Sequence, residues 1–119
     1  MNTILKILAV ITMIVFTNTA MAYGAIAVSD EQGLKSDEVG YGFGTGDSAA
    51  AAKSDAISAC KKAGNDSCEA VIAYKLCGAF AVSKSYRGVG EGNSEKNAEK
   101  NALKECGDAC RIVTSGCDI

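Results

Sequence analysis

The 119-residue chain contains no histidine, no proline and no tryptophan. The lack of histidine excludes a Ser-His-Asp triad and a Cys-His pair, in which an imidazole activates the nucleophile. It also removes one of the two side chains that build mixed cysteine–histidine zinc sites. Because tryptophan is absent and alanine is frequent, any hydrophobic core of this chain is small.

Positive charge is scarce as well. Twelve lysines and arginines stand against fourteen aspartates and glutamates, and the formal net charge is −2 at pH 7. No basic stripe with interleaved aromatic residues appears along the chain. This balance excludes a nucleic-acid partner.

Long apolar runs are confined to the first residues. Lys6 is followed by the apolar run Ile7–Phe16 and by the small-x-small sequence Ala20-Met-Ala22. This order predicts a signal peptide over residues 1–22, with cleavage before Tyr23 and a single domain over residues 23–119. The run is shorter than the roughly 20 residues of a membrane-spanning helix, so no anchor is expected after cleavage. The signal is typical of a bacterial protein exported to the periplasm or secreted.

Cysteine, in contrast, is abundant. Six cysteines in an exported chain indicate three disulfides, because the compartments outside the cytosol are oxidising. The alternative, a metal site, is disfavoured because the paired C-x2-C arrangement of structural zinc sites is missing. We therefore expect no metal and no cofactor, with disulfides formed by Cys60, Cys68, Cys77, Cys106, Cys110 and Cys117.

The exported part of the chain consists of two copies of one pattern, repeat one at residues 24–77 and repeat two at 78–117. The segment 24–29 returns as 78–83, and three alternate glycines precede a cysteine-ending segment in both copies. Each copy ends with a triplet of cysteines. The duplication predicts one α+β domain of two pseudo-symmetric β-β-α-β repeats, with an antiparallel sheet packed by two helices.

Local patterns place the elements. Small and large residues alternate over 25–28, which is typical of a strand with one tightly packed face. The glycine-spaced strands at 40–46 and 88–92 present glycines on one face only, because strand side chains alternate. Ser48 and Ser94 are expected to cap the helices that follow, and Gly64 and Gly107 to end them. The third strands are predicted at 68–76 and 110–114.

Six cysteines allow 15 pairings. Short loops between each helix end and the next strand favour Cys60–Cys68 and Cys106–Cys110. The third pair would then be Cys77–Cys117, joining equivalent positions of the two halves across the pseudo-twofold axis.

The sequence contains few residue patterns that are typical of a catalytic or phosphate-binding site. The glycine strands lack the spacing of a phosphate-binding loop and occur twice, so we interpret them as packing surfaces. Neighbouring carboxylates such as those at 30–31 and 37–38 lie in a polar stretch, where nothing would raise a pKa for acid catalysis. We predict that the protein is not an enzyme.

The two copies differ most in one length. Eleven residues separate Ser29 from Tyr41, whereas three separate Ser83 from Arg87, the partner of Tyr41. The longer segment is interpreted either as a solvated loop or as an acidic loop that docks on a basic surface. Tyr and Arg favour interfaces, and Tyr86 is equally compatible with a buried position. The predicted partner contacts are Asp30, Glu31, Asp37, Glu38, Tyr86 and Arg87.

These motifs together resemble a bacterial exported family that is catalogued as domain of unknown function 4189. The similarity rests on Tyr23–Val28, the glycine strands, the alanine-rich helix that ends in Cys60, and the sequence from Cys68 through Cys77 into the second Gly-Ala. It implies export, disulfides and a duplicated fold. It supplies no activity and no catalytic residues.

The hypothesis that follows is a non-enzymatic periplasmic or secreted binding protein, and within that class an inhibitor or immunity-type partner of another protein. The alternative is a structural envelope protein that binds a glycan or a cell-wall component.

Overall fold

The computed structural model describes residues 22–30 and 36–118. Apart from Ala22, the predicted signal peptide lies outside these residues. Within the described part, no helix is long and apolar enough to span a bilayer. In chain order the elements are β1 (Tyr23–Ser29), the 3-10 helix η2 (Ser36–Glu38), β2 (Gly40–Gly46), α2 (Ala49–Lys62), β3 (Glu69–Tyr74), β4 (Cys77–Val82), β5 (Arg87–Gly92), α3 (Glu95–Cys106) and β6 (Arg111–Cys117).

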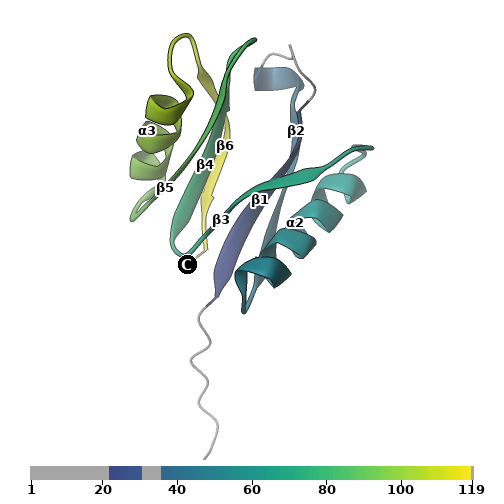
Figure 1. The fold of residues 1–119 in the computed structure, drawn as a ribbon. Helices are drawn as coiled ribbons and strands as arrows, with labels where there is room; N and C mark the ends of the chain where they lie inside the picture. The colour runs from purple at the N-terminus through teal and green to yellow at the C-terminus, as the bar shows by residue number, and fades with distance from the viewer. Residues whose placement is uncertain (1–21, 31–35, 119) are drawn as a thin grey trace, which may run out of the picture.

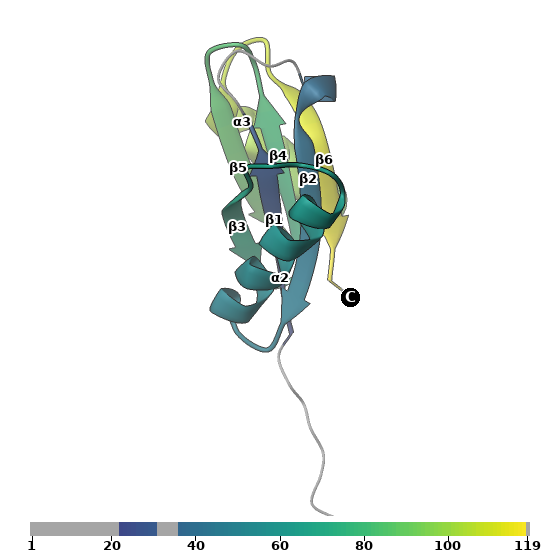
Figure 2. The same cartoon turned by 90° about the vertical axis from the view of Figure 1, so that its right-hand side faces the viewer.

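The elements form four layers, with two sheets in the middle and one helix outside each of them (Figure 1). Repeat one builds the sheet β2-β1-β3 and repeat two the sheet β5-β4-β6, both antiparallel. The predicted α+β class with two β-β-α-β repeats and three disulfides is confirmed. The strands divide between two sheets, one per repeat. Turned by 90°, α2 lies in front of its own sheet (Figure 2).

The alternating first strand of each repeat explains this layering. Ala25 and Ala27 face α2, and the alanines at 79 and 81 face α3 in the same way. The intervening large residues point between the sheets, where they form one shared core. Its buried members are Ile26, Val28, Val39, Tyr74, Phe80 and Val82.

The glycine strands let each helix approach its sheet closely. A Cβ added at Gly44 would clash with the backbone nitrogen of Ala56, and one at Gly90 would clash with that of Ala102. No side chain could fit at these positions without moving the helix. The structure therefore confirms the prediction that these glycines are packing positions, which allow the helix backbone to lie against the strand.

Both helices begin where the sequence predicts. Ser48 Oγ accepts a hydrogen bond from the backbone nitrogen of Ala51, and Ser94 Oγ accepts one from Asn97. These bonds satisfy a free N–H of each first turn. Gly107 ends α3 with φ 100°, whereas α2 is capped by Ala63, one residue before Gly64.

The structure forms the three predicted disulfides: Cys60–Cys68, Cys106–Cys110 and Cys77–Cys117. The position of the third differs from the expectation. Cys77 is the first residue of β4 and lies directly opposite Cys117 on β6, so this bond joins two strands of one sheet. It does not connect the two halves, because Cys77 belongs structurally to repeat two.

The third strands also differ from their predicted bounds. β3 ends at Tyr74, two residues early, and β6 continues to Cys117, three residues beyond its predicted end. Each shifts register once against its central strand, between residues 26 and 27 and between 80 and 81. Such irregularities bend an edge strand, which hinders its pairing with another chain.

Candidate functional site

The length difference between the repeats lies at one end of the sandwich, the upper end in Figure 1. We call residues 30–40 the insert; the structure describes Asp30 and residues 36–40 of it. Val39 is buried in the core between the sheets, and η2 lies against β6. The insert of repeat one therefore reaches the surface of repeat two.

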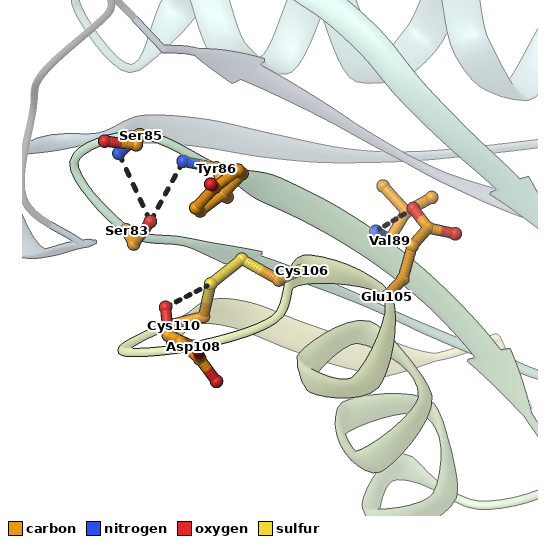
Figure 3. Close-up of a disulfide and its surroundings, with 8 residues drawn as sticks. All are labelled: Ser83, Ser85, Tyr86, Val89, Glu105, Cys106, Asp108 and Cys110. Carbon is orange, nitrogen blue, oxygen red and sulfur yellow. Dashed lines mark hydrogen bonds between the residues drawn. A yellow bond between two sulfur atoms is a disulfide. The ribbon is translucent and has the colours of Figure 1, made fainter.

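The short turn between β4 and β5 lies at the same end. Ser83 Oγ accepts hydrogen bonds from the backbone nitrogens of Ser85 at 3.2 Å and Tyr86 at 2.9 Å (Figure 3). The Ser83 backbone nitrogen donates to the Tyr86 carbonyl oxygen at 2.8 Å. These bonds fix the turn while leaving the Tyr86 side chain 62% exposed. The alternative of a buried Tyr86 is therefore wrong.

The loop closed by Cys106–Cys110 lies beside this turn (Figure 3). Ala109 in this loop has φ 62°, a left-handed conformation that costs a non-glycine residue about 1 kcal/mol. Cys110 Sγ lies 3.6 Å from the carbonyl oxygen of Asp108. A disulfide sulfur carries no proton, so this is a packing contact and not a hydrogen bond.

We define the insert end by three segments: Ser36–Glu38, Ser83–Tyr86 and Asp108–Arg111. Two grooves run between them. One, of about 410 Å³, is lined by Ser36 and Asp37 of the insert and by residues of repeat two. The second, of about 480 Å³, lies between the β4–β5 turn and the Cys106–Cys110 loop. Residues 82–84, Ala109 and Arg111 complete the first groove.

Two of the predicted contacts bind each other. The Arg87 guanidinium lies 3.5 Å from Asp30 Oδ2 and 3.5 Å from Glu69 Oε1. It also lies over the Phe80 ring, 5.5 Å from its centroid. The Asp30 side chain is only 12% exposed. Asp30 and Arg87 therefore link the two repeats, and the Arg87 side chain remains 44% exposed.

The other predicted contact residues are not part of this ion-pair cluster. Asp37 and Glu38 are exposed on η2, and Asp37 lines the smaller groove. Glu31 lies outside the described residues. Tyr86 projects at the edge of the larger groove. Sequence reasoning missed Arg111 and Ala109, whose placement depends on the packing of β6 against η2.

Few of the described residues are arranged as catalytic or metal-binding groups. All six cysteines form disulfides. In the part of the chain that the structure describes, no three Cys, Asp or Glu side chains gather closely enough to hold a metal ion. Burial, together with the charge of Asp118, raises the pKa of Tyr74 to about 12. Tyr74 pairs with Gly24 at the start of β1, so this tyrosine is far from the insert end.

One further polar cluster joins α3 to β6. Ser115 Oγ lies 2.7 Å from Glu95 Oε2 and 2.5 Å from Glu99 Oε2. A hydroxyl has a single proton to donate, so it can serve only one of the two carboxylates at a time. The cluster attaches the helix to the edge strand of its own sheet.

Comparison with known proteins gives a family but no activity. Searches of the curated proteins and of the solved structures each found no significant match. The sequence model of one family, described as domain of unknown function 4189, matches residues 23–117, which is the whole duplicated unit. The chain belongs to the family of domain of unknown function 4189.

Proposed function

We propose that this is a non-enzymatic binding protein of an extracytoplasmic compartment, periplasmic or secreted, which contacts another protein through its insert end. Three disulfides fit an oxidising compartment. The observation that carries the proposal is Tyr86, a large aromatic side chain held 62% exposed by a hydrogen-bonded turn beside two grooves. Tyrosine has only two side-chain torsions to order on binding, so it loses little conformational entropy and is frequent in interfaces.

The charges around Tyr86 specify the charge that the partner's surface must carry. Asp37 and Glu38 retain the acidic character that would meet a basic partner surface. Lys84 and Arg111 share the same end, so the complementary surface is of mixed charge. Within this class we propose an inhibitor or immunity-type role, which the exposed Tyr86 and the charged groove residues support.

Photocrosslinking tests the proposal. Benzoylphenylalanine replaces Tyr86 in one oxidised protein and Lys53, exposed on α2, in the matched control. Each is exposed to the extracytoplasmic fraction of the producing cells. We expect a discrete crosslinked protein from position 86 only, and weaker crosslinking at high salt or after D37N with E38Q.

The alternative function predicts a different product. A structural envelope protein would attach from position 86 to isolated cell-wall glycan, and that attachment would survive the two charge changes. Equal crosslinking from positions 86 and 53 would contradict both functions at this end of the molecule.

A further inference from the structure

The two repeats place opposite charges at equivalent positions around the insert end. In repeat one, Val28 lies between Tyr41 and Glu69 across the sheet. In repeat two, its counterpart Val82 lies between Arg87 and Arg111. Arg111 thus stands where repeat one has an acid.

The residues that follow the central strands show the same inversion. Asp30 lies two positions after Val28, and Lys84 lies two positions after Val82. Where repeat one supplies two carboxylates, Asp30 and Glu69, repeat two supplies two cations, Lys84 and Arg111. The Arg87 position between the acids corresponds to Tyr41, which carries no charge at neutral pH.

The consequence is that the two acids of repeat one share a cation, whereas the two cations of repeat two form no ion pair among the described residues. Arg87 lies 3.5 Å from each of its two carboxylates. Within residues 22–30 and 36–118, neither Lys84 nor Arg111 forms an ion pair. Both line the 410 Å³ groove, which has the size of a small binding pocket. The groove is open, and among the described residues its one carboxylate, Asp37, forms no ion pair with either cation.

The insert residues that line the groove restrict the kind of anion that it can bind. These residues are Ser36 and Asp37. A doubly charged phosphate would be repelled by Asp37, whereas a single carboxylate has less charge to repel. A polypeptide also brings backbone N–H donors, which the Asp37 carboxylate and the Ser36 hydroxyl can accept. An acidic peptide segment therefore suits both sets of lining residues: its carboxylate suits Lys84 and Arg111, and its backbone N–H groups suit Ser36 and Asp37.

We propose that this groove binds an acidic segment of a partner polypeptide, with Lys84 and Arg111 holding one side-chain carboxylate. The guanidinium of Arg111 offers a paired hydrogen bond to the carboxylate, and Lys84 contributes charge. The inference rests on the proposed function, since it names the chemistry that one surface of the partner presents to the insert end.

A peptide titration tests this directly. The ¹⁵N-labelled oxidised protein is titrated at low ionic strength with acetyl-Gly-Glu-Gly-amide, which carries one carboxylate, with acetyl-Gly-Gln-Gly-amide, and with inorganic phosphate. We expect saturable amide shifts at residues 83–85, Ala109 and Arg111 with the glutamate peptide. The glutamine peptide lacks the carboxylate, and phosphate lacks the backbone N–H donors. Each should therefore bind with an affinity at least about ten-fold weaker.

Variants assign the effect to the groove. The exposed substitutions K84Q and R111Q together should weaken the glutamate peptide about ten-fold or more, and R111K alone should lose less. K104Q, on the outer face of α3, removes one exposed lysine elsewhere and should leave binding unchanged. Unchanged amide spectra outside the groove show that each variant is folded.

The outcomes separate this inference from the proposed function. Equal binding of phosphate, or of the glutamate peptide by the K84Q/R111Q protein, overturns the acidic-peptide site. So does the lack of saturable shifts at millimolar peptide. If crosslinking from position 86 persists in those cases, the proposed function stands without the groove. If the peptide binds but position 86 gives no specific crosslink, the groove stands and the protein interface does not.

Discussion

The two repeats share their helix–sheet contacts but differ in one disulfide, Cys77–Cys117, which has no counterpart in repeat one. Glycines face the helix backbone in both, and serines cap both helices. At the lower end of the sandwich in Figure 1, repeat two closes its sheet with Cys77–Cys117. Repeat one has Tyr23 and Lys75 at those positions, with the Lys75 ammonium 5.8 Å from the ring centroid. A covalent bond in one copy is therefore replaced by a weak cation–π contact in the other.

The upper end shows the reverse distribution. There repeat one supplies the insert and the two acids that hold Arg87, while repeat two supplies the exposed Tyr86 and two cations without an ion pair among the described residues. The shared positions account for the fold. The unshared positions at the upper end bring together charged side chains and an exposed tyrosine beside two grooves.

The largest expected effect concerns the bond that only repeat two has. Replacing Cys77 and Cys117 by alanine opens a loop that spans 40 residues, and in the chain-entropy account this costs about 4 kcal/mol of the free energy of unfolding. Urea unfolding of the oxidised protein measures it. Removing Cys106–Cys110, which spans four residues, should cost about half as much. Equal losses would show that loop length does not govern these bonds.

A second prediction concerns a position that the repeats share. G44A and G90A each put a methyl group against helix backbone, so each should lower the free energy of unfolding by about 3 kcal/mol. Thermal or urea unfolding of the two variants should give similar losses. T45A, on the exposed neighbouring residue of β2, is the control and should change little. A large difference between G44A and G90A would mean that the two helix–sheet contacts are not equivalent.

The third prediction uses a tyrosine that has no counterpart. Tyr74 is 3% exposed, whereas the equivalent residue of β6 is Gly116. Burial first, and Asp118 second, raise the pKa of Tyr74 from 10 to about 12 in the folded protein. The folded state then holds the phenolic proton more tightly than the unfolded state does. The stabilising contribution is complete below pH 10, is lost as the pH rises toward 12, and amounts to about 2–3 kcal/mol.

Unfolding free energies measured from about pH 9 to about pH 12 test this against Y74F. The variant lacks the ionisable hydroxyl, so its curve should fall less steeply over the same range. Parallel curves for the two proteins would show that Tyr74 does not ionise with a raised pKa.

The sequence predicted the elements well because their signals are local. The alternation at 25–28, the period-two glycines and the serine caps each depend on a few neighbouring residues. The position of the third disulfide was mistaken because Cys77 and Cys117 were aligned as the last members of two triplets. Cys77 lies nine positions after Cys68, but Cys117 lies seven positions after Cys110. That difference was a signal that the two cysteines occupy different structural positions.

The site was harder to predict because it is made between the repeats. Asp30 and Arg87 are 57 positions apart, and only sheet-on-sheet packing brings them to 3.5 Å. The groove likewise joins Ser36 of the insert to Arg111 of β6. An alignment of the two copies shows the inverted charges, but it cannot show which of them meet. The broken symmetry directs attention to this end of the molecule, and the structure adds that two of the predicted contact residues, Asp30 and Arg87, pair with each other.

The smallest expected effect lies in the loop that the two repeats close differently. Cys60 and Cys68 are eight positions apart, whereas Cys106 and Cys110 are four apart. The shorter connection coincides with the left-handed conformation of Ala109 at φ 62°, and within the described residues Ala109 is the one non-glycine with positive φ. A109G removes the steric cost of that conformation and also raises the entropy of the unfolded chain. The steric term is slightly larger, so we expect a net gain of at most about 0.5 kcal/mol.

Urea unfolding of A109G beside the unmodified protein measures this gain. G107A provides the opposite control, because Gly107 has φ 100° and ψ −148°, a region that alanine occupies only with strain. G107A should therefore destabilise the protein. If A109G is also destabilising, the loop does not hold Ala109 under strain. If it is stabilising, repeat two maintains a strained residue at the wall shared by both grooves, where repeat one has a longer, glycine-containing connection. Strain kept at such a place is more readily explained by a binding surface than by folding, because the fold is stabler without it.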